Sequence, residues 1–140
     1  MTDMTGSGNR VLTPAAWAPP RGYENGIVAS GHIVMLAGQI GWNPVTTLFE
    51  TDDFGLQTRQ ALANIVTLLR EAGAEPRHLA RLTWFVTDRA AYVSHRREIG
   101  TVYRELIGAY YPPMSVIVVS GLIEERALVE IEATAVIPLA

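Results

Sequence analysis

Residues 128–136, LVEIEATAV, have the strict alternation of a β-strand. The apolar face of this strand consists of Val129, Ile131, Ala133 and Ala135. Glu130 and Glu132 are two residues apart, so both carboxylates lie on the other face. Because a buried carboxylate is costly without a partner, this second face needs either ionic partners or a function for the two charges.

Further β-rich stretches occur along the chain. They predict a hairpin over 26–38 that turns at Ser30 and Gly31, and single strands at 78–88, 114–120 and 127–138. The sequence therefore predicts five strands, the last of which contains the two glutamates.

Two segments have apolar residues at helical spacing, about 52–72 and about 90–107. Thr51 or Asp52 is expected to cap the start of the first helix and Gly73 to follow its end. The sequence YYPP ends the second helix.

The predicted order is β-β-α-β-α-β-β, which indicates an α+β fold with a mixed sheet and two helices packed on one face. Residues 1–140 are expected to form a single domain, with residues 1–10 disordered or frayed. Residues 82–86 and 116–119 are apolar on both faces of their strands, whereas two helices cover only one face. Since soluble monomers avoid large exposed apolar surfaces, the other face is expected to pack against another subunit.

The composition argues against several classes of protein. The chain has 140 residues, 49% of them hydrophobic, which is too apolar for a disordered chain. Its 11 Lys and Arg against 14 Asp and Glu, without a dense basic cluster, argue against a nucleic-acid partner. No apolar run approaches the roughly 18 residues that a membrane span needs, and no signal peptide is evident, so a cytoplasmic protein is expected.

Metal and cofactor sites are not expected either. The chain lacks cysteine, and His32, His78 and His95 fall on separate predicted elements without ligand spacing. Glycine-rich phosphate loops and nucleophile elbows are also missing from the sequence.

Five motifs in order, AGQIGWNP, ALANIVTLLREAGA, LTWFVTD, YYPPMS and VEIEATAV, resemble the RidA/YjgF family of enamine/imine deaminases, also labelled endoribonuclease L-PSP-like. The resemblance extends from about Tyr23 to Pro138. It implies a chorismate-mutase-like mixed sheet with two helices on one side. It also implies a homotrimer whose sheets face inward, with small-molecule pockets in the clefts between subunits.

The resemblance implies site residues as well. Glu130 stands at the glutamate position of the family, Tyr23 at a pocket tyrosine and Gly38 at a pocket glycine. The family position for an arginine that binds the substrate carboxylate is Met114, and a thioether cannot make that bidentate contact. The usual cysteine two residues on is Val116.

Each candidate also has a structural interpretation. Glu130 either orients water and handles a proton or pairs with an arginine such as Arg81, and Glu132 is expected to be structural. Tyr23 either lines the pocket or packs in the N-terminal arm, and Met114 is either pocket wall or core. The remaining predicted pocket residues are Trp42 and Ser115, together with Val116. His95, on the apolar side of its helix, is expected to be structural.

These features predict a deaminase-like hydrolase that releases ammonia from a reactive enamine or imine. Because Met114 replaces the arginine, the substrate is expected to lack a free carboxylate at the usual position, as in a thioester or a cyclic enamine from aromatic-amine catabolism. The alternative is a non-catalytic trimer that binds a small metabolite. An endoribonuclease is disfavoured by the acidic charge balance.

Overall fold

The computed structural model describes residues 9–140. Its centre is a four-stranded mixed sheet in the order β3-β6-β4-β5. The strands are β3 (His32–Ile40), β4 (Leu79–Val86), β5 (Met114–Val118) and β6 (Val129–Ile137). Strand β6 pairs antiparallel with β3 on one side and β4 on the other, and β4 pairs parallel with β5.

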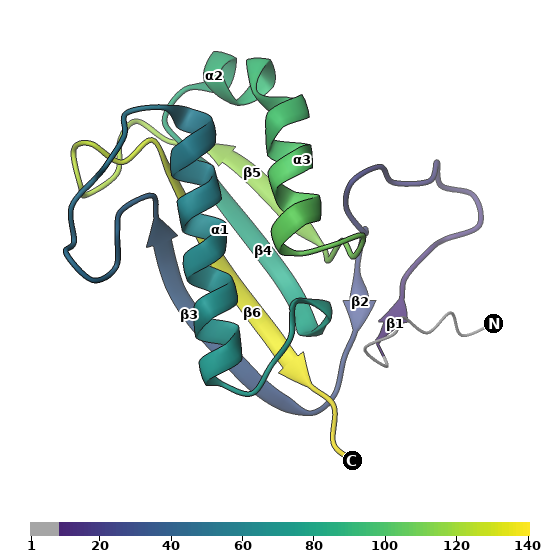
Figure 1. Ribbon diagram of the computed structural model, residues 1–140. Coiled ribbons are helices and arrows are strands. Elements are labelled where there is room, and N and C mark those ends of the chain that lie inside the picture. The colour runs from purple at the N-terminus through teal and green to yellow at the C-terminus, as the bar shows by residue number, and fades with distance from the viewer. Residues whose placement is uncertain (1–8) are drawn as a thin grey trace.

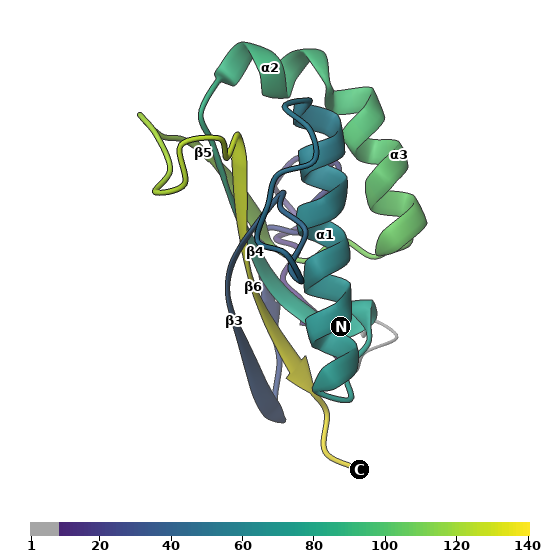
Figure 2. The same cartoon turned by 60° about the vertical axis from the view of Figure 1, so that its left-hand side comes forward.

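The helices lie on one face of this sheet (Figure 1). They are α1 (Phe54–Glu71), α2 (Arg89–Ser94) and α3 (Arg96–Leu106), with a 3-10 turn η1 (Pro76–His78) before β4. In the view of Figure 2 the sheet is seen nearly edge-on, and within residues 9–140 no helix covers its other face, here called the open face. The predicted α+β fold with helices on one side of a mixed sheet is thus confirmed. None of the described helices is long and apolar enough to cross a membrane.

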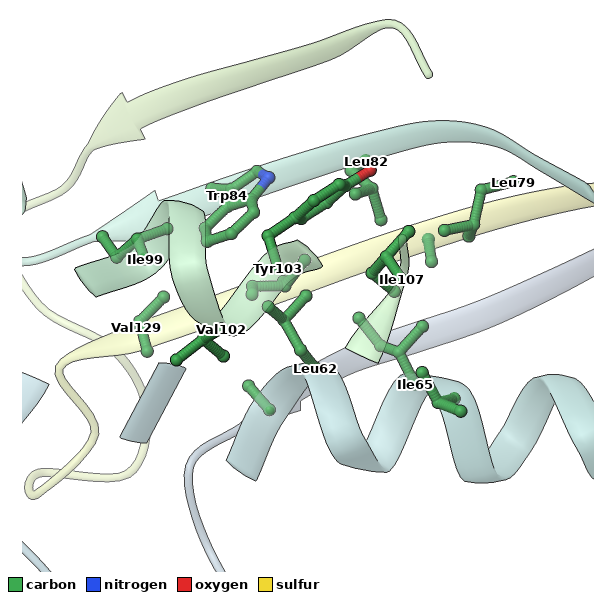
Figure 3. Close-up of a cluster of buried hydrophobic side chains, with 14 of the residues drawn as sticks. Leu62, Ile65, Leu79, Leu82, Trp84, Ile99, Val102, Tyr103, Ile107 and Val129 are labelled. Atoms are coloured by element: carbon green, nitrogen blue, oxygen red, sulfur yellow. The ribbon is translucent and has the colours of Figure 1, made fainter. Parts of the chain in front are cut away.

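The core lies between the helices and the sheet (Figure 3). The apolar set of β6 is buried there, and its neighbours come from α1, β4 and α3. They include Leu62, Ile65, Leu69, Leu79, Leu82, Trp84, Val86, Ile99, Val102 and Tyr103. Burial of these side chains supplies the main drive for folding, since each removes apolar area from water.

The first helix begins one residue later than the expected cap. Asp53 is the N-cap, and its Oδ2 accepts a hydrogen bond from the Leu56 N–H at 2.9 Å. Thr51 Oγ1 instead accepts from the Asp53 N–H, which holds the capping residue in place. At the other end, the Gly73 N–H donates to the Arg70 carbonyl, as expected for the residue that follows the helix.

The predicted second helix is in fact two helices, because the helical hydrogen bonding is interrupted at His95. The backbone N–H of His95 donates to the carbonyls of both Ala91 and Tyr92, which ends α2, and His95 then becomes the N-cap of α3. Its Nδ1 lies 2.7 Å from the Ala91 carbonyl, and Ser94 Oγ donates to the same carbonyl. Such local bonds compete with continuous helix. They also fit the structural role expected for His95.

The predicted hairpin over 26–38 is wrong. Strand β2 (Ile27–Val28) pairs with β1 (Arg10–Val11) in a separate two-stranded sheet, and β3 pairs with β6 instead. Gly31, at φ 144°, lies directly against the Ile137 carbonyl and redirects the chain between β2 and β3. Asn9 is buried and Arg10 is in β1, so the predicted frayed segment does not include these two residues; residues 1–8 lie outside the described range.

The apolar residues of the open face come mainly from the two edge strands. Ile33 and Met35 of β3 are 67% and 81% exposed, and Ile117 of β5 is also exposed. On β4 the open face instead carries Arg81, Thr83 and Phe85, and Val118 lies on the helix side beside Val86. The expectation that β4 and β5 are apolar on both faces is therefore only partly correct.

Gln57 of α1 connects the helix to the segment before β6. It is fully buried, its Nε2 donates to the carbonyls of Thr51 and Arg126 at 3.0 Å, and its Oε1 accepts from the Leu128 N–H at 2.9 Å. This side chain therefore sets where β6 begins.

Replacing Gln57 with Met should lower the free energy of unfolding by about 3 kcal/mol, because the shape is kept while buried backbone groups lose their partners. Denaturant unfolding measures this. Gln60→Met is the matched control on the same helix. Among the residues that the structure describes, Gln60 donates only to the Asn64 side chain, so its loss should cost about 1 kcal/mol or less. Equal effects in the two variants would contradict the role given to Gln57.

Candidate functional site

Glu130 extends from β6 onto the open face of the sheet. It is half-buried and pairs in register with Ile40 of β3 and Phe85 of β4. A Cβ atom placed on Gly38 would lie only 2.7 Å from Glu130 Cδ and 2.8 Å from its Cγ. A side chain at position 38 would therefore force the Glu130 carboxyl group to move. Two residues predicted for the site, Glu130 and Gly38, are therefore in direct contact.

An irregularity in β3 makes this contact possible. The register of β3 on β6 shifts between Leu36 and Gln39, so Gly38 lies within a β-bulge. Bulges re-aim side chains and frequently occur beside active sites.

The environment of Glu130 favours its neutral form. Partial burial, followed by the nearby charge of Glu132, raises the pKa of the Glu130 carboxyl above its ordinary value. Within residues 9–140, neither glutamate forms an ion pair or a side-chain hydrogen bond. Arg81, the alternative partner, lies opposite Thr134 and its Nε donates to Thr83 Oγ1 at 3.4 Å. The pairing of Glu130 with Arg81 is thus not found.

Met114 lies on the other side of the sheet. Its side chain packs against the core and lines a pocket of about 190 Å³ between α3 and the β4–β5 edge. Val116 also faces the helices and lines a neighbouring pocket, whereas Ser115 pairs with Thr83 on the open face.

The N-terminal arm brings Tyr23 close to this edge. Glu24 forms a parallel bridge with Pro113, its N–H lies 3.4 Å from the Pro112 carbonyl, and Gly22 lines the Met114 pocket. Tyr23 lies between Gly22 and Glu24 and is 41% exposed.

Trp42 lies elsewhere, in the loop after β3. Its ring contacts Phe49 at a centroid distance of 6.2 Å, and its carbonyl accepts from Asn64 of α1. The predicted site residues therefore divide among four places: Glu130 with Gly38, Met114 and Val116 near the Tyr23 arm, Ser115 on the open face of β5, and Trp42. A role in binding or catalysis stays a prediction for each of them.

One group of side chains within residues 9–140 has the spacing of metal ligands. Asp53, His95 and Glu98 each offer an atom within 4.8 Å of the others. Asp53 caps α1 and His95 bonds to the Ala91 carbonyl, so two of the three already have structural partners.

Comparison with known proteins places the chain in a family. The model of the family described as Endoribonuclease L-PSP matches residues 13–137. A RutC family protein from Pyrococcus horikoshii is 32% identical over 125 residues, which covers 89% of this chain and 94% of that protein. The chain belongs to the RidA/YjgF family.

Solved structures agree with this assignment. The Rid family protein YyfB from Yersinia pestis, described as a protein of unknown function, is 35% identical with a TM-score of 0.78, covering 91% of this chain and 98% of its own. A Mycobacterium tuberculosis member of the YjgF/YER057c/UK114 family is 36% identical with a TM-score of 0.60, covering 82% and 86%. RidA/YjgF membership supports either small-molecule imine or enamine deamination or an endoribonuclease L-PSP-like function.

Two residues in the Met114 pocket were not identified from the sequence of this RidA/YjgF member. Trp84 of β4 and Arg96 of α3 both line that pocket. A signal for Arg96 was present: Tyr92, Arg96, Ile99 and Tyr103 follow helical spacing along one side of the 90–107 segment. Trp84 has no such signal, because it lies in a segment that the sequence predicts to be apolar on both faces of its strand.

Replacing Glu130 with Gln should flatten the pH dependence of stability. Because the pKa of Glu130 is raised in the folded state, the native protein binds more protons than the unfolded chain over a window that begins near pH 4.5. The free energy of unfolding of the wild type therefore falls as pH rises through this window. In Glu130→Gln the side chain does not titrate, so this contribution to the pH dependence is lost. Melting temperatures from pH 4 to 8 measure it, with the exposed Glu124→Gln as control. A wild-type pH profile in Glu130→Gln would contradict the shifted pKa.

Proposed function

We propose that this protein is a deaminase-like hydrolase that releases ammonia from a reactive enamine or imine. The observation that carries the proposal is Glu130: an unpaired, half-buried carboxyl group with a raised pKa, held over a glycine. A carboxyl group whose pKa moves toward neutrality can both donate and accept a proton at working pH.

The proposed reaction needs only a water and this proton carrier. Neutral Glu130 donates its proton to the imine nitrogen, which makes the C=N carbon electrophilic. The resulting carboxylate takes a proton from the attacking water, whose oxygen bonds to that carbon. Glu130 then donates this proton to the amine nitrogen and accepts the hydroxyl proton as the C–N bond breaks, which releases ammonia, leaves a carbonyl group and restores neutral Glu130. The net change is addition of water and loss of ammonia, without oxidation or reduction.

Met114 limits the substrate. A thioether packed against the core offers no positive charge and no hydrogen-bond donor to a carboxylate. The substrate is therefore expected to lack a free carboxylate at that position, as a masked carboxyl group or a cyclic enamine does.

A complete cleft requires a second copy of the chain. Glu130 and Gly38 lie on the open face, whereas Met114 and Val116 face the helices, so one chain does not bring the two sets together. A homotrimer with the open faces inward, as the RidA/YjgF resemblance implies, covers Ile33 and Met35 and forms clefts between subunits.

The alternative is a trimer that binds a small metabolite without chemistry. The absence of an arginine at position 114 favours it. The two proposals differ in the role of Glu130, which is required for turnover only in the first.

Replacing Glu130 with Gln should lower ammonia release from an enamine generated in situ by about 10²–10⁴-fold, the range for loss of a positioned proton donor. Glu132→Gln is the matched control on the same face and strand, and it should retain near-normal turnover. A folded, fully active Glu130→Gln protein would establish that this carboxyl group is not the catalyst, and the binding trimer would then be preferred.

Replacing Met35 with Asp should abolish assembly without unfolding the subunit. Met35 is 81% exposed in the single chain, so a charge there costs little until a partner buries it. Sedimentation should show wild type at about three times 15.3 kDa and the variant as a monomer. Val45→Asp, at a loop residue that is 90% exposed, is the control and should assemble normally. A monomeric wild type would contradict the trimer.

A further inference from the structure

The charged residues of the four-stranded sheet all lie on its open face. Arg81 is in β4, and Glu130 and Glu132 are in β6; strands β3 to β6 contain no other Lys, Arg, Asp or Glu. Glu132 pairs in register with Thr83, and Arg81 pairs with Thr134. Arg81 and Glu132 are thus offset by two residues, about 7 Å along the strands. The middle of the open face therefore carries a positive and a negative charge close to each other.

These two charges have no ionic partner within one chain. The Nε of Arg81 donates to Thr83 Oγ1 at 3.4 Å, and among residues 9–140 its guanidinium group forms no ion pair. Glu132 likewise forms neither an ion pair nor a side-chain hydrogen bond in that range. Both side chains are exposed, so water solvates them and the missing partners cost little in a single chain.

A partner that covers the apolar residues of the open face also covers these charges. Met35 of β3 pairs in register with Thr134 of β6, and Thr134 pairs with Arg81, so the three residues form one row across the sheet. Neighbouring strands are about 4.8 Å apart, which places Met35 about 10 Å from Arg81. Met35 is 81% exposed, so its burial is a main gain from binding at this face. Because a buried charge without a counter-charge is strongly destabilising, the partner has to offer an acid to Arg81 and a base to Glu132.

A second copy of the chain meets these requirements. Its open face has the same apolar residues and the same two charges, so Arg81 of one copy can face Glu132 of the next. In a closed ring each subunit then uses its Arg81 once and its Glu132 once. Of the two glutamates, Glu132 is exposed, whereas Glu130 is half-buried and packed against Gly38. Glu132 is therefore the carboxylate that a partner reaches.

We propose that the open face binds the open face of a second copy through an ion pair between Arg81 of one subunit and Glu132 of the next. This rests on the assembly in the proposed function and deepens it, because it names the residues that join the subunits. The pair also leaves Glu130 without an ionic partner, as a proton carrier in the cleft requires.

Sedimentation of two charge-reversal variants tests the pair. Arg81→Glu and Glu132→Arg each make like charges face each other across the contact. Each should raise the protein concentration at which half of the chains are assembled by at least about tenfold. Arg97→Glu and Glu71→Arg, reversals at exposed residues of α3 and α1 on the other side of the sheet, are the controls and should assemble like wild type.

A mixture of the two variants shows whether the pair lies between chains. Arg81→Glu chains offer acids at both positions and Glu132→Arg chains offer bases at both, so mixing restores opposite charges only between subunits. The equimolar mixture should assemble at concentrations at which each variant alone is monomeric. A ring of three keeps one like-charge contact, so the mixture should remain weaker than the double variant that carries both reversals. The double variant should assemble about as well as wild type.

Neutral variants keep the test independent of folding defects. Circular dichroism reports whether each reversed chain is folded. Arg81→Gln and Glu132→Gln retain much of the shape of each side chain, and combining them should weaken assembly no more than either change alone, because both break the same pair. Wild-type assembly of either reversal, a mixture that assembles no better than its components, or additive effects of the two neutral changes would each overturn the proposal.

Failure of the ion pair and failure of the deaminase are distinguishable. Ammonia release is measured at concentrations at which the chains are assembled. If the wild type is a trimer that releases ammonia through Glu130 but the mixture shows no rescue, the ion pair fails and the deaminase stands. If the mixture is rescued but no enamine or imine releases ammonia, the ion pair stands and the deaminase fails. A monomeric wild type overturns the pair, whatever its activity.

Discussion

The alternation of apolar and acidic side chains along β6 is the constraint on which the rest of this structure depends. The strand is paired on both sides, so its backbone cannot rotate to move a side chain from one face to the other. Val129, Ile131, Ala133 and Ala135 must then enter the core, and Glu130 and Glu132 must face away from it. A shift of one residue would bury two carboxylates among Leu62, Ile65 and Leu82. The fold and the candidate catalytic group are thus set by the same pattern.

The one-sided placement of the helices has a functional consequence. The helix side of the sheet holds a small aromatic pocket lined by Arg96, and the open side holds Glu130 over a glycine. Neither side chain has an ion-pair partner in residues 9–140. In one chain these groups are separated by the sheet itself. A trimer that covers Ile33 and Met35 would therefore protect the exposed apolar residues and also complete the site, which links stability of the assembly to function.

At position 114 a methionine stands where the family resemblance implies an arginine, so this part of the pocket wall is apolar. A methionine on β5 extends the apolar wall formed by Tyr103 and Tyr111, and the guanidinium group of Arg96 stands at the α3 end of the same pocket. This apolar wall is the basis for proposing a substrate without a free carboxylate at that position.

The sequence by itself determined the features that are encoded locally. Periodicity gave the helices and the strands after residue 52, and five motifs in register gave the RidA/YjgF family and pointed to Glu130 and Gly38. Only the tertiary structure decided which segments meet. It showed that β2 pairs with β1, that a bulge places Gly38 against Glu130, and that Trp84 and Arg96 share a pocket with Met114. These facts depend on contacts between residues far apart in the chain, which no local pattern of apolar and polar residues encodes.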